Sequence, residues 1–209
     1  MTARVARIWR GQTLMRVLMN EALSDFTLNG MVADIGGGRS PDYFDFFKKG
    51  DSFSVSAVDA SLGTIDFEND RLPFRDGSVD TVICCNVLEH IYNHSFLVSE
   101  MNRILKEGGH AIGFVPFFIQ YHPDPHDYFR YTHEALIKIF AHAGFKDVSI
   151  RAIGNGPFTV NFNNIMLSFP RMLRVIGLYP TLLADRIFLS LRPGGRERYP
   201  LGYVFSMRK

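Results

Sequence analysis

The chain has 209 residues, enough for one α/β domain with a full hydrophobic core but too few for two domains of ordinary size. Hydrophobic residues make up 46% of the sequence and charged residues 21%, which indicates a globular rather than a disordered protein. The formal net charge of only +2 gives no indication of nucleic-acid binding, because proteins that bind nucleic acid usually carry a strongly basic surface.

The sequence predicts neither a signal peptide nor a transmembrane helix. Arg4, Arg7 and Arg10 stand among single apolar residues, without the continuous apolar stretch of a signal peptide. No segment reaches the roughly 18 uncharged apolar residues that a span needs. Cys84 and Cys85 are adjacent, which sterically disfavours a disulfide between them, so a reducing cytoplasm is the expected setting.

Residues 4–25 are predicted to form one amphipathic helix, loosened at Gly11, because their apolar side chains recur at helical spacing. The helix is expected to pack on the domain or to cover its site. Asn29-Gly30 predicts a turn before the first strand.

The segment 31–38 reads as a buried strand that runs into a glycine turn. Apolar residues fill the strand apart from Asp34, and Gly36, Gly37 and Gly38 follow. Glycines permit positive φ angles and leave no Cβ to hold a ligand away from the backbone. A strand, a glycine turn and a helix start form the nucleotide-binding arrangement of doubly wound α/β folds.

Two classes of ligand compete for this turn. A dinucleotide site requires Gly-x-Gly-x-x-Gly, and Pro41 takes the place of the last glycine, which disfavours a dehydrogenase. The carboxylate of Asp34 would repel a pyrophosphate but suits a cationic ligand. The turn therefore favours a cationic cofactor.

Residues 41–49 predict a short helix with Pro41 in its first turn and Gly50 at its end, and the second strand is expected over 53–58. Asp59 then lies about twenty residues past the glycine turn, the offset at which a carboxylate binds a ribose in this architecture. Asp59 could instead cap a following helix.

The order of the remaining predicted elements and motifs is typical of a known protein family. Strands are predicted over 79–85, 110–115, 148–153 and 199–208, with a helix over 134–143. The motifs are Leu-Pro-Phe at 72–74, Asp-Gly-Ser at 76–78, Asn-Val-Leu-Glu-His-Ile at 86–91 and Arg-Ile-Leu-Lys-Glu-Gly-Gly at 103–109. With the glycine turn and Asp59, this order resembles the class I S-adenosylmethionine-dependent methyltransferases, specifically the type 11 group, over about residues 30–150.

The resemblance implies a Rossmann-like doubly wound α/β sheet, mostly parallel, with an antiparallel last strand at its edge and a helical insert before it. In a single domain, it assigns an N-terminal helix to 1–28, the cofactor-binding core to 30–153, the insert to 154–198 and the last strand to 199–209. It also implies S-adenosylmethionine as the cofactor, with binding residues Asp34, Gly36, Gly37, Gly38, Asp59, Ala60, Glu68, Asn69 and Asn86. Asn69 is larger than the residue usual in the family.

The loop 122–132 supplies the candidates for the substrate side, because loops at the carboxyl ends of strands bind ligands in such folds. It resembles the His-Pro-x-Asp-Tyr-Phe-Arg-x-Thr stretch of methyltransferases found with sugar and surface-polysaccharide pathways. The expected substrate contacts are Asp124, Asp127, Tyr128 and Arg130. A purely structural role is the alternative, in which the aromatic residues pack the loop and Arg130 pairs with a carboxylate. No metal site is expected, because two prolines stiffen the loop and its spacing matches no zinc motif.

Methyl transfer requires a base only when the acceptor is a hydroxyl or a carbon acid. His90, His122 and His126 are the candidates, because a neutral imidazole accepts a proton near neutral pH. The alternative for His90 is a helix-start residue that touches nothing reactive.

The insert is highly apolar, and Pro170, Gly177 and Pro180 are expected to divide it into two or three short helices. From residue 157 onward the chain has eight Lys or Arg residues against two acidic ones. The segment 157–198 could lie on an anionic membrane at the inner face of the cell, cover a lipid-linked substrate as a lid, or form a dimer face.

The sequence thus predicts methyl transfer from S-adenosylmethionine to a small-molecule or glycan acceptor, lipid-linked or related to surface polysaccharide. The alternative is a catalytically inactive cofactor-binding protein of the same fold.

Overall fold

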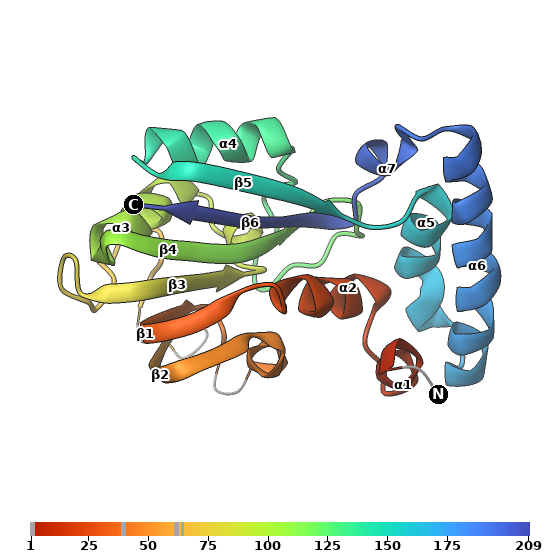
Figure 1. Ribbon diagram of the computed structural model, residues 1–209, viewed down its shortest axis with the longest axis horizontal. Helices are drawn as coiled ribbons and strands as arrows, with labels where there is room; N and C mark the ends of the chain where they lie inside the picture. Colours follow the sequence, from red (N-terminus) through yellow and green to blue (C-terminus); the bar gives the residue numbers. More distant parts are fainter. Residues whose placement is uncertain (1–2, 39–40, 61–62, 64) are drawn as a thin grey trace.

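The computed structural model describes residues 3–38, 41–60, 63 and 65–209. In this part of the chain six strands form one sheet in the order β2-β1-β3-β4-β6-β5 (Figure 1). The strands are β1 (Thr27–Ile35), β2 (Lys48–Val58), β3 (Val79–Cys85), β4 (Leu105–Pro116), β5 (Lys146–Ile153) and β6 (Gly202–Arg208).

The predicted fold class is confirmed. The pairs β1–β2, β1–β3 and β3–β4 are parallel, and β6 is antiparallel to both of its neighbours. The expected place of the last strand at the edge is wrong, because β6 lies between β4 and β5. Tyr203, Val204 and Phe205 of β6 are all buried, as an interior strand covered on both faces requires, whereas β5 is largely exposed and forms the edge.

Helices cover both faces of the sheet. They are α1 (Ala3–Trp9), α2 (Leu14–Leu23), α3 (His94–Ile104), α4 (His133–His142), α5 (Pro157–Ile165), α6 (Arg171–Leu191) and α7 (Gly195–Arg198), with short 3-10 helices η1 (Asp42–Phe46), η3 (Leu88–His90) and η4 (Met166–Ser168). One core lies under α3 and α4, and a second lies under α2, η1 and α5. Cys84 belongs to the first core and Cys85 to the second, so the two buried thiols pack on opposite faces of the sheet.

The N-terminal segment forms two helices instead of the single one predicted. Gly11 takes a φ of +102°, a left-handed conformation that ends α1. Thr13 then starts α2, because its hydroxyl accepts a hydrogen bond from Arg16 N at 3.2 Å. The helix break is therefore caused by Gly11 and the Thr13 cap. The apolar periodicity continues across both residues and so did not reveal the break.

The predicted turn at Asn29-Gly30 is also wrong, because both residues lie inside β1. Gly30 has a φ of +65° at a register shift, and Met31 N donates to Asp80 Oδ2 at 2.8 Å instead of continuing the ladder. The Asn-Gly pair that is typical of a turn here occupies an irregular position inside a strand.

The second strand starts at Lys48, five residues before its predicted start, and contains Gly50, which was expected to end a helix. A Cβ on Gly50 would lie 1.8 Å from Asn29 Oδ1, so this glycine permits the close approach of β1. The helix start that Asp59 could have capped lies partly outside the described residues.

The insert contains one long helix, α6, where Gly177 and Pro180 were expected to break it. A Cβ on Gly177 would lie 2.8 Å from the Phe162 ring, so the glycine lets α5 and α6 pack closely. Pro180 is exposed, while Leu178 on the opposite side is buried, and this packing maintains the helix through the proline. Asp185 links the two helices, because its carboxylate accepts hydrogen bonds from Phe158 N (3.0 Å) and Thr159 N (2.8 Å) at the start of α5.

The insert and α1 lie together beyond one end of the sheet (Figure 1). This is the end at which β5 leads into α5. Within the described part of the chain, no helix has both the length and the apolar character to cross a membrane.

Candidate functional site

The candidate site lies where the strand order reverses direction. From β1 the chain continues to β2 on one side, and it later returns to β3 on the other side. Gly36 follows β1 and Asn86 follows β3, so both lie at the carboxyl edge of neighbouring parallel strands. Ligands of open α/β sheets bind at such a switch point.

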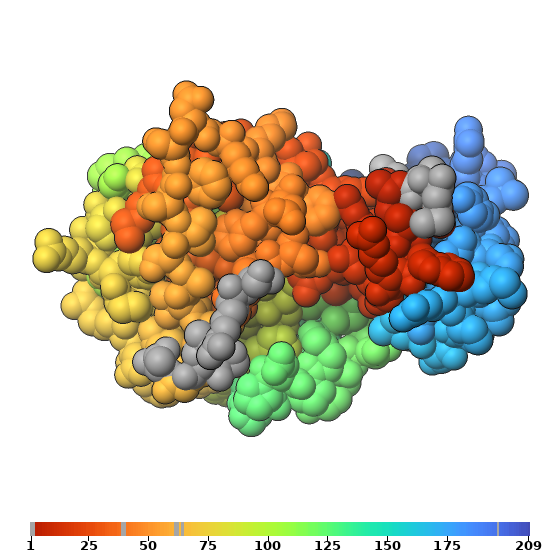
Figure 2. Space-filling view, turned by 90° about the horizontal axis from the view of Figure 1, so that it is seen from below, coloured from red at the N-terminus to blue at the C-terminus, as the bar shows by residue number. Residues whose placement is uncertain are grey.

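A cleft of about 560 Å³ opens at this edge. Its described lining comes from α2, the glycine turn, η1, the end of β3, η3 and the loop after β4, and comprises Met15, Arg16, Gly36, Gly37, Pro41, Asp42, Tyr43, Cys85, Asn86, His90, Ile119, His122 and Asp124. In the space-filling view the segment after β4 (green) lies across a hollow from the red and orange N-terminal part of the chain (Figure 2). The cleft therefore has Gly36 and Gly37 on one wall and His90 and His122 on the other.

The glycine turn encloses the carboxylate of Asp34. Gly36 and Gly38 have φ angles of +76° and +65°, and a Cβ on Gly37 would lie 1.6 Å from Asp34 Oδ2. The Asp34 side chain is fully buried; Oδ1 accepts from the Tyr43 hydroxyl at 2.5 Å, and Oδ2 has no hydrogen-bond partner among the described residues. Burial raises the pKa of Asp34 to about 7. An unsatisfied carboxylate oxygen thus lies directly under a backbone without side chains.

Asp59 is buried where β2 ends, and a Cβ on Gly38 would lie 3.5 Å from its Oδ2, so it lies next to the glycine turn. Ala60 beside it is exposed. Glu68 and Asn69 do not line the cleft: Glu68 Oε1 accepts from Tyr92 N at 3.0 Å, and Asn69 Nδ2 donates to Asp66 Oδ2 at 2.8 Å. Asp59 is therefore adjacent to the turn, whereas Glu68 binds the segment before α3 and Asn69 binds its own loop.

Asn86 has a left-handed backbone, with a φ of +55°. Asparagine tolerates this conformation better than most residues. Its backbone N donates to Phe114 O at 2.9 Å, and its Nδ2 contacts Met19 Sδ at 3.5 Å. The turn after β3 is thereby fixed between β4 and α2, with Asn86 in the lining of the cleft.

Three side chains converge on the opposite wall. Glu89 is fully buried, and its Oε1 lies 3.6 Å from His90 Nε2 and 4.0 Å from His122 Nε2. The two imidazole rings are 5.0 Å apart. Burial raises the pKa of Glu89 to about 8 and lowers the pKa of His122. His90 is therefore not the isolated helix-start residue of the alternative reading.

The rest of the predicted substrate loop has structural contacts. Arg130 donates to Asp127 Oδ1 at 2.5 Å and to Oδ2 at 2.7 Å, and this ion pair lowers the pKa of Asp127 to about 2. Tyr128 N donates to Glu89 O at 2.8 Å. The His126 ring and the side chains of Asp127, Tyr128 and Arg130 are not in the described lining. The pairing of Arg130 with a carboxylate is thus present, as the structural alternative expected.

Sequence reasoning missed Arg16, Tyr43 and Glu89. Arg16 lies on the site-facing side of α2, 3.9 Å from Asp42, and supplies a cation to the cleft. Glu89 lies within the 86–91 motif, which was the available signal for it. Arg16 and Tyr43 carry no local signal, because only the packing of α2 and η1 brings them to the site.

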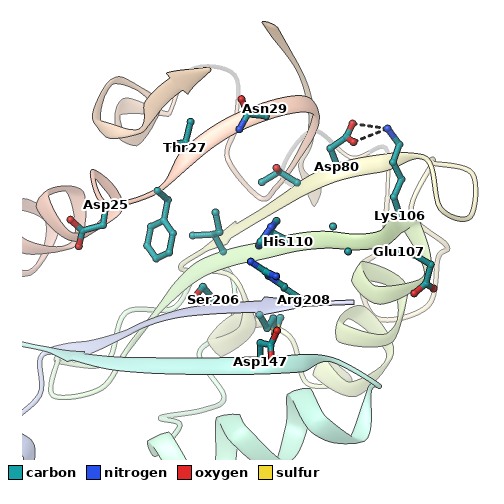
Figure 3. Close-up of a pocket in the computed structure, with 16 residues that line it drawn as sticks. Asp25, Thr27, Asn29, Asp80, Lys106, Glu107, His110, Asp147, Ser206 and Arg208 are labelled. Atoms are coloured by element: carbon teal, nitrogen blue, oxygen red, sulfur yellow. Dashed lines mark hydrogen bonds and ion pairs between the residues drawn. The ribbon is translucent and has the colours of Figure 1, made fainter. Parts of the chain in front are cut away.

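A larger cleft, of about 850 Å³, lies at the opposite edge of the sheet. Figure 3 shows Asp25 and Thr27 before and at the start of β1, and Arg208 at the end of β6. Lys106 Nζ points to Asp80 and binds its two carboxylate oxygens at 2.7 and 2.8 Å. This cleft is at the amino ends of the parallel strands, so its position does not match that of ligand sites in this fold.

Comparisons with known proteins agree with the fold. Residues 47–113 match the family described as "Methyltransferase domain". A probable S-adenosylmethionine-dependent methyltransferase of Mycobacterium tuberculosis is 29% identical over 93 residues, which are 42% of this chain and 34% of that protein. This chain thus spans about a third of that relative's length.

Solved structures share the fold at low sequence identity. Phosphoethanolamine N-methyltransferase 2 of Haemonchus contortus, in complex with S-adenosyl-L-methionine, superposes with a TM-score of 0.55 at 15% identity, over 92% of this chain and 51% of that chain. The 1,6-didemethyltoxoflavin-N1-methyltransferase of Burkholderia thailandensis has a TM-score of 0.55 at 15% identity, over 98% of this chain and 81% of that one.

The sheet and its switch-point site define a protein with the Rossmann-like fold of class I S-adenosylmethionine-dependent methyltransferases. The match of residues 47–113 to the methyltransferase-domain family agrees with the resemblance to the type 11 group that the motifs indicated.

Proposed function

We propose that the protein transfers a methyl group from S-adenosylmethionine to a small-molecule or glycan acceptor. The observation that carries this proposal is the Asp34 carboxylate, buried under Gly37 at the switch point with one oxygen that has no hydrogen-bond partner among the described residues. A buried carboxylate in a region of low dielectric favours a cationic ligand. The residues present therefore fit a cofactor that carries an ammonium and a sulfonium.

Each wall of the cleft has a role in binding this cofactor. Asp34 attracts the ammonium, and Arg16 supplies the opposite charge for the carboxylate of the same amino-acid group. Asp59, with Ala60 beside it, binds the ribose next to the glycine turn, and Asn86 borders the sulfonium end. Glu68 and Asn69 support the adenine side by holding their loop in place.

When bound, the cofactor supplies a methyl group activated by the positive sulfur. The chain has to hold the acceptor in line and exclude water, because displacement depends on close alignment of the two reactants. His90, His122 and Asp124 border the acceptor side of the cleft. Burial keeps the His122 imidazole neutral at neutral pH, so this ring can accept a proton from a hydroxyl acceptor. The backbone carbonyl of His126 orients His90, which makes His126 a positioning residue.

Calorimetric titration of the protein with S-adenosylmethionine, S-adenosylhomocysteine and NAD tests the proposal. We expect saturable binding of the first two with one site per chain, and no binding of NAD. An Asp59→Ala variant is expected to bind both sulfur compounds at least about tenfold more weakly, because it loses hydrogen bonds to a charged acceptor. Binding of NAD alone, or unchanged affinity in Asp59→Ala, would overturn the assignment of this cleft.

We further propose that the acceptor is lipid-linked and that α6 lies on an anionic membrane surface. Large apolar side chains form one exposed stripe along α6, at Met172, Leu173, Ile176, Tyr179, Leu183, Ile187 and Leu191. Arginines accompany the stripe, and the part of the chain from residue 157 has eight basic residues against two acidic ones. An amphipathic helix of this kind binds anionic lipid through apolar burial and charge together.

The insert also contacts both walls of the cleft. Asn163 Oδ1 accepts from Met15 N of α2 at 2.8 Å, and Asn164 Nδ2 donates to Phe118 O in the loop after β4 at 3.3 Å. A membrane under α6 would therefore lie close to the cleft opening, where a lipid-linked acceptor could enter.

Flotation with phosphatidylglycerol vesicles tests the membrane proposal. We expect the protein to float with anionic vesicles at low salt and not with phosphatidylcholine vesicles, because charge contributes to the binding. The double variant Ile176→Glu/Leu183→Glu should lose at least about 90% of this binding, since each acid places a charge in the lipid-facing stripe. Ile137→Glu, on an exposed apolar position of α4, serves as the control. The proposal would be contradicted if the wild-type protein does not bind the vesicles, or if light scattering shows a dimer whose interface is the stripe.

A further inference from the structure

We infer that Glu89, His90 and His122 form a binding site for one divalent transition-metal ion. Each residue offers one ligand atom, and the three atoms lie within 4.8 Å of one another. Glu89 and His90 come from η3, whereas His122 comes from the loop after β4. The inference goes beyond the proposed methyl transfer, because metal binding can be measured without cofactor or acceptor.

The carboxylate of Glu89 is the first argument for an ion. The side chain is fully buried, and neither Oε1 nor Oε2 has a hydrogen-bond partner among the described residues. The nearest imidazole nitrogens, at 3.6 and 4.0 Å from Oε1, are too distant for good hydrogen bonds. A buried carboxylate left in this state is costly, and a bound cation would satisfy it.

The orientation of the two imidazoles is the second argument. His90 Nδ1 lies 2.5 Å from the carbonyl oxygen of His126, which can only accept, so Nδ1 carries the proton and Nε2 keeps its lone pair toward Glu89. His122 Nδ1 lies 3.4 Å from Asp127 Oδ2 and 3.4 Å from Arg130 Nη2, and Asp127 Oδ2 also accepts from His122 N at 2.9 Å. A carbonyl or carboxylate behind a histidine is the usual support of a metal-ligating ring.

The donor set indicates the kind of ion. Two imidazole nitrogens and one carboxylate oxygen suit Zn²⁺, Mn²⁺ or Fe²⁺ better than Mg²⁺ or Ca²⁺, which prefer oxygen ligands. Ligand distances of about 2.1 Å require the three atoms to approach one another by about 1 Å. Small rotations of the two partly exposed rings can provide this approach.

An ion at this position would face the cleft. His90 and His122 are part of its lining, together with Asn86. Three protein ligands leave coordination positions open on that side, where an oxygen of the methyl acceptor could bind and lose its proton more easily. In the metal-bound protein the two imidazoles act as ligands, and the ion takes over the activation of a hydroxyl acceptor.

The sequence reasoning expected no metal because it considered only the spacing within residues 122–127. The structure supplies the other two ligands, Glu89 and His90, from a segment more than 30 residues before His122. Spacing within one loop could not reveal such a site.

Metal binding by the full chain, prepared without a histidine tag and treated with chelator, tests the inference. We expect Zn²⁺ and Mn²⁺ each to bind at one ion per chain, measured by calorimetry and, for Mn²⁺, by electron paramagnetic resonance. Glu89→Gln and His122→Ala should each weaken binding at least about 100-fold, because loss of a direct ligand costs more than loss of its support. His142→Ala, an exposed histidine of α4, should bind like the wild type.

Three results would overturn the site: no stoichiometric binding of either ion, unchanged affinity in Glu89→Gln, or an equal loss in His142→Ala. Glu89→Gln preserves the shape of a buried side chain and removes its charge, so we expect it to fold, and thermal denaturation verifies this. S-adenosylhomocysteine binding to the same metal-free samples shows separately whether the cofactor site is intact. If no metal binds but S-adenosylhomocysteine binds normally, the inferred metal site is wrong and the proposed function still stands.

Discussion

Replacing Gly37 by alanine is expected to weaken S-adenosylhomocysteine binding at least about 100-fold, because the buried carboxylate beneath the turn leaves no room for a side chain. The new Cβ would lie 1.6 Å from Asp34 Oδ2 and 2.5 Å from the Tyr43 hydroxyl. Neither side chain is free to move aside, since the Tyr43 hydroxyl donates to Asp34 Oδ1 at 2.5 Å. The turn would have to move away from the cleft, and isothermal titration calorimetry measures the loss.

Gly194→Ala is the matched control for this variant. A Cβ at Gly194 would meet nothing within 4 Å, and the residue has no left-handed φ. The control should bind like the wild type, and circular dichroism should show that Gly37→Ala retains the sheet. A Gly37→Ala protein with wild-type affinity would show that the glycine turn does not contact the ligand.

The affinity for S-adenosylhomocysteine is expected to fall by up to about tenfold per pH unit below pH 7, because Asp34 must lose its proton to attract the ligand's ammonium. Burial raises the pKa of Asp34 to about 7, so the free protein holds this proton at lower pH. A bound ammonium favours the carboxylate and lowers that pKa, so binding releases a proton below pH 7. The measurement is calorimetry between pH 5 and 8 in buffers of different ionisation enthalpy.

The Asp34→Asn variant separates the contribution of Asp34 to the pH dependence from that of the groups around it. Asp34 accepts a hydrogen bond from Tyr43, and the negative charge of Asp59 raises the pKa of Asp34. Burial keeps the thiols of Cys84 and Cys85 protonated across this pH range. The variant should bind about tenfold more weakly at pH 8 and show a nearly flat profile. A profile as steep as that of the wild type would assign the pH dependence to a different group.

Local strand-and-turn patterns were enough to place several of the candidate residues at one cleft. The strand over 79–85 has its predicted bounds, and Gly36, Gly37 and Asn86 line the cleft. These residues sit where a buried strand ends, and strand ends of one parallel sheet meet at one edge. Sequence adjacency to a strand was therefore enough to place them.

The opposite wall of the cleft depends on contacts between distant segments. Glu89 lies near His122 because the backbone N atoms of Tyr128 and Phe129 donate to the Glu89 carbonyl and help to attach the loop after β4 to η3. The continuity of α6 through Pro180 likewise depends on packing against α5. Hydrophobic periodicity reports the local preference of a segment, so neither of these two tertiary contacts could be predicted from it.

The central place of β6 sets an order of assembly for the sheet. β5 pairs with no other described strand, so it joins the sheet only through β6. The docking of β5 therefore has to wait for the pairing of β6 with β4, which are strands far apart in sequence. Hydrogen exchange should thus divide the sheet into two cooperative units, with β1, β3 and β4 protected longest and the β5 edge opening first.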